Sequence, residues 1–299
     1  MNVYPQPMLN HFLRRGWAVT MTDYEGLGTT DRTHPFLLGE SAAHGVLDIV
    51  RTGRLLFGSR MSDRFAIVGH SQGGQAALFA AHHAQEWTPE LELAGVAATA
   101  PANHPLGLVR AGAITDEAPT PEQPNGGFAF TPLFLSGAMG GDTTIRADQV
   151  LSARAYRDLW PQVEQRCRAG LSEYDSWGGL RGVEQFRLGY PLLPNQDQRN
   201  FDRQLTAMNP DVTITVPIRI SQAADDERVL ADPQPLLGTD ALVRELAATN
   251  SASGNTVTYQ RYDEGAVTPD EELGVHFGTI SHDLPALTRW LDRILGKHK

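Results

Sequence analysis

The run Gly69-His-Ser-Gln-Gly73 constrains the fold of this chain more than any other part of its sequence. It follows Phe65-Ala-Ile-Val68, a short apolar run typical of a buried strand, and it leads into the alanine-rich run 75–82, which consists of strong helix formers. Where a strand turns so tightly into a helix, a side chain at position 69 or 73 is expected to collide with its neighbours. The sequence therefore predicts a sharp strand-to-helix turn that raises the hydroxyl of Ser71 above the edge of a sheet.

Strand-like and helix-like segments alternate on both sides of this turn. The expected strands are 17–23, 65–68, 91–99, 212–220 and 256–262, and the expected helices are 39–57, 240–248 and 284–295. Such alternation implies right-handed crossovers and a mostly parallel sheet flanked by helices. With the serine at a strand-to-helix turn, it predicts an α/β-hydrolase fold.

The alternation fails between about residues 102 and 209, where Pro, Gly and polar stretches surround one or two helical segments. We interpret this part as a largely helical cap inserted between sheet strands. The expected organisation is a first part of the core at 1–104, a cap at 105–208 and a second part of the core at 209–299.

Composition excludes several classes of partner and cofactor. The chain has 25 Lys and Arg against 35 Asp and Glu, a net charge of −10, which disfavours binding to nucleic acid. No apolar run approaches the roughly 20 residues that span a bilayer, so we expect no stable membrane insertion. Cysteine occurs once, and no HExxH or Cys-rich spacing is present, so we expect no metal site.

Ser71 is the expected nucleophile, and the amide of Gln72, at the start of the following helix, is the expected oxyanion donor. In this type of fold an acid and then a histidine follow the serine in the chain. His276 and His282 are the candidate bases. His282 precedes Asp283, the expected N-cap of the last helix, where the helix dipole would disfavour an imidazolium. His276 is expected in the preceding loop and is therefore favoured.

The acid is expected in the loop after the strand that ends at Ile220, because functional groups gather at the carboxyl ends of parallel strands. Asp225 and Asp226 both lie there. Two adjacent carboxylates cannot both face one imidazole, and the pattern alone leaves the choice between them open.

Several segments together resemble the secretory lipase family, the capped α/β-hydrolases of the actinobacterial and fungal lipase A type. They are Tyr24-Glu-Gly-Leu-Gly28, His34-Pro-Phe to Asp48-Ile-Val, Gly69-His-Ser-Gln-Gly73 and Trp290-Leu-Asp-Arg293. The resemblance implies hydrolysis of small-molecule or lipid esters without a cofactor. It also implies Ser71 as nucleophile, Asp226 as acid and His276 as base.

The chain departs from the family pattern at its start. If 17–23 is the family's fourth strand, residues 1–10 are too few to hold three strands, so we expect the chain to lack the first strands, the oxyanion loop after the third strand and a signal peptide. Secretion would follow only from the resemblance. Two alternatives to ester hydrolysis stay open: acyl transfer with the same residues, and a catalytically impaired binding protein.

Overall fold

The computed structural model describes residues 5–29, 33–251 and 254–296, and it divides into two compact units. The first unit consists of Met1–Tyr24, Gly39–Asn103 and Pro210–Lys299, and the second of Glu25–Leu38 and His104–Asn209. The longer segment of the second unit, His104–Asn209, overlaps the expected cap at 105–208, and the role of this segment as a cap stays a prediction. Segment 25–38, which the sequence analysis left with the core, groups with the second unit.

A parallel sheet forms the centre of the first unit. It consists of β1 (Arg64–His70), β2 (Glu92–Thr99), β3 (Ile218–Ala223) and β4 (Val257–Tyr262), which lie in that order, each pairing in parallel with the next. Because all four run in the same direction, their carboxyl ends meet at one edge, where loops can bring side chains together.

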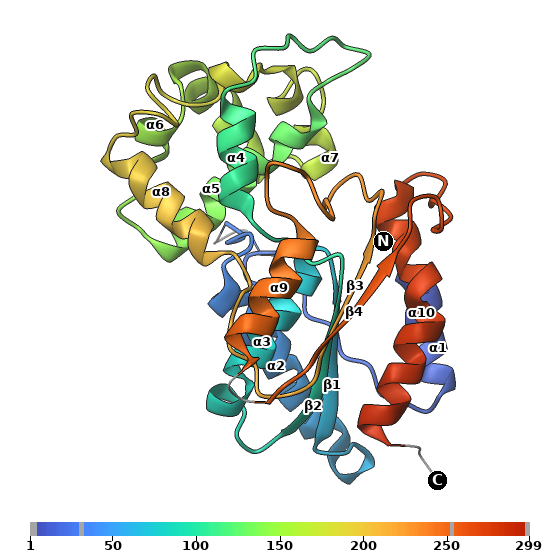
Figure 1. Ribbon diagram of the computed structural model, residues 1–299. Helices are drawn as coiled ribbons and strands as arrows, with labels where there is room; N and C mark the ends of the chain where they lie inside the picture. Colours follow the sequence, from blue (N-terminus) through green and yellow to red (C-terminus); the bar gives the residue numbers. More distant parts are fainter. Residues whose placement is uncertain (1–4, 30–32, 252–253, 297–299) are drawn as a thin grey trace. The chain divides into compact units, whose positions relative to one another are not determined.

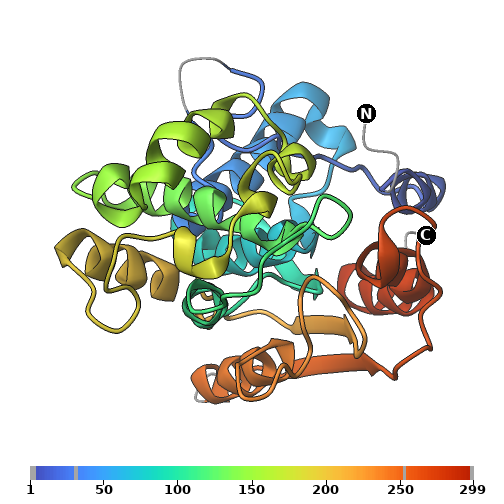
Figure 2. The same cartoon turned by 90° about the horizontal axis from the view of Figure 1, so that it is seen from above.

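Helices cover both faces of this sheet (Figure 1). One face carries α2 (Gly39–Phe57), α3 (Gln72–Trp87) and α9 (Thr239–Thr249), and the other carries α1 (Gln6–Arg14) and α10 (Gly274–Leu295). In the view from above, α1 and α10 lie side by side (Figure 2). The sheet is therefore the middle of three layers, as the alternating sequence pattern predicts.

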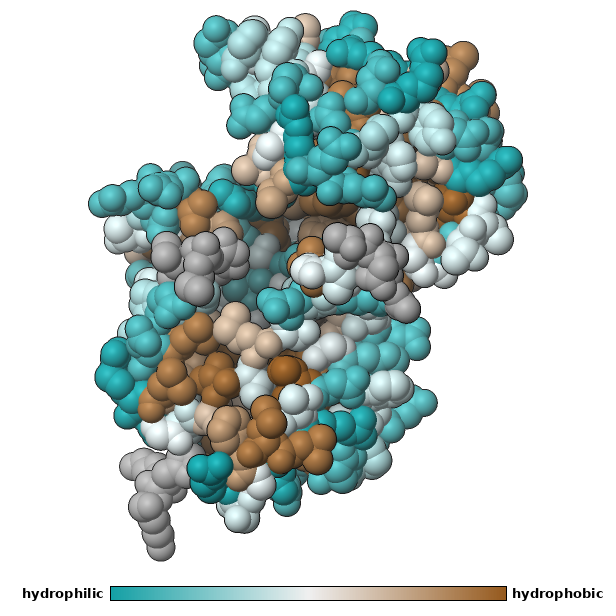
Figure 3. All heavy atoms as spheres, turned by 180° about the vertical axis from the view of Figure 1, so that it is seen from behind, coloured by the Kyte–Doolittle hydropathy of each residue, from teal (hydrophilic) through white to brown (hydrophobic). Residues whose placement is uncertain are grey.

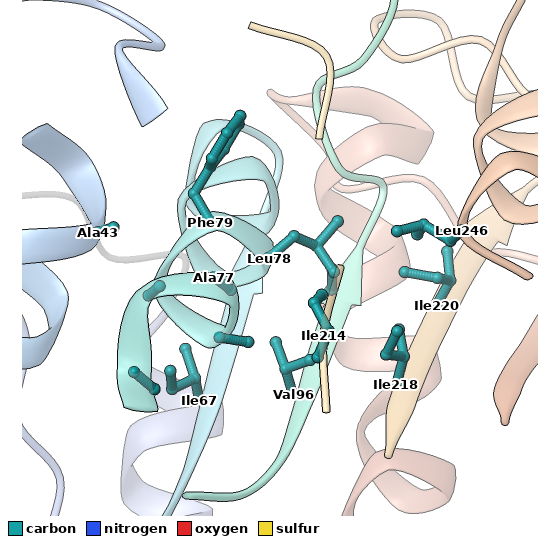
Figure 4. Close-up of a cluster of buried hydrophobic side chains, with 14 of the residues drawn as sticks. Ala43, Ile67, Ala77, Leu78, Phe79, Val96, Ile214, Ile218, Ile220 and Leu246 are labelled. Carbon is teal, nitrogen blue, oxygen red and sulfur yellow. The ribbon is translucent and has the colours of Figure 1, made fainter. Parts of the chain in front are cut away.

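Two apolar clusters hold the layers together. The larger one lies between the sheet and the α2, α3 and α9 layer, where side chains such as Leu78, Val96 and Ile220 interlock (Figure 4). The smaller one, around Phe12 and Trp290, packs α1 and α10 against the opposite face. Burial of this kind contributes roughly 25 cal/mol for each Å² of apolar surface removed from water.

Residues 17–23 do not form the strand that their composition predicts. A strand needs a neighbouring strand to bond with, and in the described residues β1 pairs with β2 and has no strand on its other side. The segment is held by side chains instead: Thr20 and Thr22 lie against the glycines at 53 and 45 of α2, and Trp17 and Val19 pack on the smaller apolar cluster.

Two other expected elements have different bounds. β3 begins at Ile218, after Pro217, rather than at residue 212, since proline cannot donate to the sheet ladder. The last helix begins at Gly274 instead of 284 and continues through Pro285. The sequence analysis took Asp283 as the N-cap of this helix, whereas the structure places the start of the helix ten residues before 284.

The second unit is built from helices and loops. Its α-helices are α4 (Pro105–Ala113), α5 (Phe130–Gly141), α6 (Ala147–Val150), α7 (Arg168–Leu171) and α8 (Gln196–Ala207). Its short 3₁₀-helices are Gly126–Ala129, Trp160–Glu164, Trp177–Gly179 and Gly182–Glu184, and Ala155–Leu159 is a short π-helix; a further 3₁₀-helix, Gly58–Arg60, lies in the first unit. Fully buried side chains, Trp177 and Phe201 among them, give the second unit its own core.

The surface of the first unit is not uniformly polar. Figure 3 shows apolar side chains gathered on the face of this unit that it presents. Large exposed apolar residues of the unit include Leu13, Met21, Leu55, Leu56 and Phe57. Even so, no helix among the described residues has the length and hydropathy needed to cross a membrane.

Candidate active site

Ser71 sits at the turn between β1 and α3 in a strained backbone conformation, with φ 58° and ψ −121°. A side chain that is not glycine rarely adopts such angles, and where it does the surrounding structure must hold it there. Four backbone hydrogen bonds do so: the amide of Ser71 donates to Thr99 O (3.0 Å), and Ser71 O accepts from the amides of Gly74 (2.9 Å), Gln75 (3.2 Å) and Ala102 (3.0 Å). The turn is thus tied to the end of β2.

The glycines beside Ser71 are required to different degrees. A Cβ on Gly69 would lie 1.9 Å from Gly73 O, which the turn cannot accommodate. A Cβ on Gly73 would meet nothing closer than the hydroxyl of Tyr24 at 3.5 Å, an ordinary contact, so the expected collision at position 73 is wrong. The second tight position is Gly74, where a Cβ would lie 2.9 Å from Pro101 Cα.

Gln72 is the first residue of α3, so its amide lies at the amino end of a 16-residue helix. This end carries the positive pole of the helix dipole. The position is one at which a backbone N–H can stabilise a negative oxygen next to the serine.

Asp226 and His276 form a buried hydrogen-bonded pair. His276 Nδ1 lies 2.8 Å from Asp226 Oδ2 and 3.0 Å from Oδ1, and the two residues are 1% and 2% exposed. The carboxylate also accepts hydrogen bonds from the amides of Arg228 and Val229, both 2.9 Å, and from Gln222 Nε2, 3.2 Å. These donors orient Asp226 before any substrate binds.

Burial would by itself raise the pKa of Asp226. The hydrogen bond from His276, the charge of its imidazolium form, and the amides of Val229 and Arg228 act in the opposite direction and hold the pKa below its ordinary value. Asp226 is therefore ionised at neutral pH, where it can hold Nδ1–H of His276 and stabilise an imidazolium.

His276 lies in the first turn of α10 and not in a loop before it. The expectation that His276 precedes the last helix is therefore wrong, and the helix-dipole argument does not favour His276 over His282. Asp283 is not an N-cap: it lies inside α10, buried, and accepts two hydrogen bonds from Arg219 at 2.5 and 2.7 Å.

The two alternative residues have other contacts. Asp225 Oδ2 accepts a hydrogen bond from the amide of Gly265 at 3.0 Å. His282 is exposed and stands edge-on to the ring of Tyr262, with ring centroids 4.6 Å apart. The structure thus brings Asp226, and not Asp225, to His276.

The described link between Ser71 and His276 runs through His70, the residue before Ser71. The ring of His70 lies 4.4 Å from the ring of His276 between centroids. In the described part of the chain no hydrogen bond joins Ser71 Oγ to His276. Such bonds are often long or misaligned before substrate binds and tighten in the reacting complex.

No group of three or more His, Cys, Asp or Glu side chains that could hold a metal occurs among the residues described here. The sequence analysis did not predict that His70 contacts His276, because only the glycines and the serine of the motif are tied to a known function. It also missed Gln222 and Arg228, whose contacts with Asp226 depend on the loop after β3.

Comparison with known proteins found a family model and several solved structures that resemble parts of this chain. Residues 4–111 match the family model for secretory lipase. Over 91 residues the chain is 34% identical to Lipase 7 of Candida albicans, an alignment that covers 30% of this chain and 20% of the relative. The match to secretory lipases thus concerns residues 4–111, and the aligned part of the chain spans about a fifth of the length of Lipase 7.

Solved structures show that the chain has an α/β-hydrolase fold. The rice cell wall degrading esterase LipA from Xanthomonas oryzae superposes with a TM-score of 0.65 at 17% identity, covering 93% of this chain and 71% of that one. Lipase A of Candida antarctica superposes with a TM-score of 0.59 at 18% identity, covering 89% and 56%. At such identities the likeness concerns the fold alone.

Proposed function

We propose that this chain is a serine hydrolase that cleaves carboxylic esters through an acyl-enzyme on Ser71. The observation that carries the proposal is the buried Asp226–His276 pair, 2.8 Å apart, in the same unit as a serine held at a strained strand-to-helix turn. A histidine oriented by an ionised carboxylate is the arrangement that activates a hydroxyl.

The reaction follows from the roles of these groups. His276 Nε2 takes the proton of Ser71 Oγ as the oxygen attacks the ester carbonyl, and the amide of Gln72 holds the resulting oxyanion. When the tetrahedral intermediate collapses, the C–O bond to the alcohol breaks and His276 returns the proton to the departing oxygen. Water, deprotonated by His276, then releases the acid and restores Ser71. Asp226 stabilises the imidazolium in both halves.

Labelling with a fluorophosphonate tests the nucleophile directly. We expect the folded chain to be labelled and to hydrolyse p-nitrophenyl esters, and Ser71→Ala to lose both activities. Ser281→Ala, at an exposed position of α10, is the matched control and should behave as the parent chain. A folded parent chain that stays unlabelled would contradict the proposal and favour a protein that binds without turnover.

A panel of p-nitrophenyl esters from acetate to palmitate gives the preferred acyl length. Adding an alcohol to the same reaction distinguishes hydrolysis from acyl transfer, since both share the acylation step. We expect the free acid as the main product. A new ester as the main product would instead identify an acyltransferase.

A further inference from the structure

His70 connects the nucleophile to the proposed base through the backbone. Its Nε2 lies 3.0 Å from the carbonyl oxygen of His276, and its ring packs in a tilted arrangement against the ring of the same residue, with centroids 4.4 Å apart and an interplanar angle of 44°. His70 is the residue before Ser71, so one peptide unit separates the nucleophile from a side chain that contacts the base twice.

The partner of His70 determines its tautomer. A carbonyl oxygen only accepts hydrogen bonds, so Nε2 must carry the hydrogen and Nδ1 is unprotonated in the neutral ring. Burial is the main cause that lowers the pKa of His70 to about 3, and the positive charge of protonated His276 acts in the same direction. The charged groups of the adjoining loop after β3 are Asp226, which opposes the shift, and Arg228, which adds to it. The aromatic ring of Phe277 completes the surroundings, 5.1 Å from His70.

The first turn of α10 is also held from the loop that follows β3. Glu227 Oε2 accepts from the amide of His276 at 3.2 Å. Arg228 Nη2 donates to Leu273 O at 3.2 Å, and its guanidinium lies 4.8 Å from the ring centre of Phe277. These contacts fix the turn relative to Asp226. The contacts of His70, unlike those of Glu227 and Arg228, fix the first turn of α10 relative to Ser71.

We propose that His70 is a positioning residue that sets the distance and angle between Ser71 and His276. It donates Nε2–H to the carbonyl of His276 and packs against the ring of the same residue. As a neutral ring it does so without repelling the imidazolium that forms when His276 takes the proton of Ser71. This inference rests on the proposed function, in which His276 is the base. A misplacement of about 1 Å in such a pair can cost on the order of 100-fold in rate.

Two substitutions separate the hydrogen bond from the bulk of the ring. His70→Phe keeps an aromatic ring but removes the donor, and His70→Gln supplies an amide N–H at a similar reach. We expect His70→Phe to lower kcat at least about ten-fold with little change in KM, because the defect concerns orientation and not substrate binding. His70→Gln should recover most of the loss. His282→Phe, an exposed histidine of α10, should leave both constants unchanged.

The pH dependence of kcat/KM reports whether His70 carries a charge, which the size of the loss in kcat alone does not. If His70 stays neutral, the acid limb of kcat/KM in the parent chain follows one ionisation, that of His276. His70→Phe should also follow a single ionisation, because the substitution removes no group that titrates in this range. A parent profile with two ionisations near pH 6 would contradict a neutral His70.

Nitrogen NMR of the histidine rings tests the inference without any turnover. His70 should show the Nε2–H tautomer and should not titrate between pH 5 and 8, and His70→Phe should shift the ring signals of His276 while His282→Phe does not. An Nδ1–H tautomer, or titration near pH 6.5, would overturn the inference. So would a parent-like kcat in folded His70→Phe. Absence of labelling in the parent chain would instead refute the proposed function, and the NMR result would still decide the placement of His70.

Discussion

At the scale of single residues, the strained angles of Ser71 show how much of the surrounding structure serves one side chain. Backbone strain of this kind costs on the order of 1–3 kcal/mol. Here it is offset by hydrogen bonds to Thr99 O and from Gly74 and Ala102, and it is permitted by the absence of a side chain at Gly69. The serine is therefore held ready before substrate binds, which is the condition for attack on a bound carbonyl.

The two adjacent aspartates give a residue-scale prediction with its own control. Asp226→Asn replaces the carboxylate that holds His276 Nδ1–H, so we expect kcat to fall by about 10⁴-fold, the loss typical when the acid of such a triad becomes an amide. Asp225→Asn keeps an oxygen that can accept from the amide of Gly265 and should change kcat by no more than about three-fold. Steady-state kinetics with one p-nitrophenyl ester measures both. Similar losses in the two variants would refute the role given to Asp226.

At the scale of elements, a buried polar network ties α10 to the sheet. Asp283 of α10 accepts from Arg219 of β3 at 2.5 and 2.7 Å, from Ser221 at 2.9 Å and from Tyr262 of β4 at 2.5 Å. Ser221 also bonds to Thr99 Oγ1 at 2.9 Å, at the end of β2. The network therefore reaches the residue whose carbonyl holds the amide of Ser71, and it fixes the helix that carries His276.

Removing one partner of the buried Arg219–Asp283 ion pair should lower the stability of the fold. Arg219→Met leaves Asp283 buried without its cation, and we expect the free energy of unfolding to fall by about 3–5 kcal/mol. The double variant Arg219→Met with Asp283→Leu removes both charges and should recover much of that loss. Urea denaturation of the two single variants and the double variant gives the coupling energy. Losses that simply add would show that the pair is not coupled.

At the scale of the whole molecule, the half-buried neutral ring of His70 links stability to pH. Its pKa is about 3 in the folded chain and about 6.5 in the unfolded chain, so between these values only the unfolded chain takes up the proton. Stability is then lost as pH falls below about 6.5. The depressed pKa of Asp226 adds a loss at lower pH, as the solution passes through the pKa of that carboxyl in the folded state.

We expect His70 alone to account for up to about 2 kcal/mol of stability lost between pH 7 and pH 5. His70→Gln has no titrating side chain at this position, so its stability should fall less over the same interval. Urea midpoints measured at several pH values for both chains test this. Parallel curves would show that His70 titrates normally in the folded protein.

Local patterns in the sequence were enough to predict much of the fold. The helix at 39–57, the strands around 65–68, 91–99 and 256–262, and the turn at Ser71 all follow from the spacing of apolar residues and from glycine. These features depend on residues close together in the chain. The order of serine, acid and histidine also narrowed the candidates to Asp225 or Asp226 and to His276 or His282.

Only the tertiary structure decided the rest, because the deciding partners lie far apart in sequence. Residues 17–23 have strand-like composition, yet a strand forms only where a neighbouring backbone can bond to it. The helix α10 begins at Gly274 and not at the expected position after Asp283. Asp283 does not cap a helix, because its carboxylate is held by Arg219 of β3. His70 and His276 are 206 positions apart, and no local pattern encodes their contact. The local sequence limits the secondary structure that each segment can adopt, whereas tertiary packing determines which distant side chains come into contact.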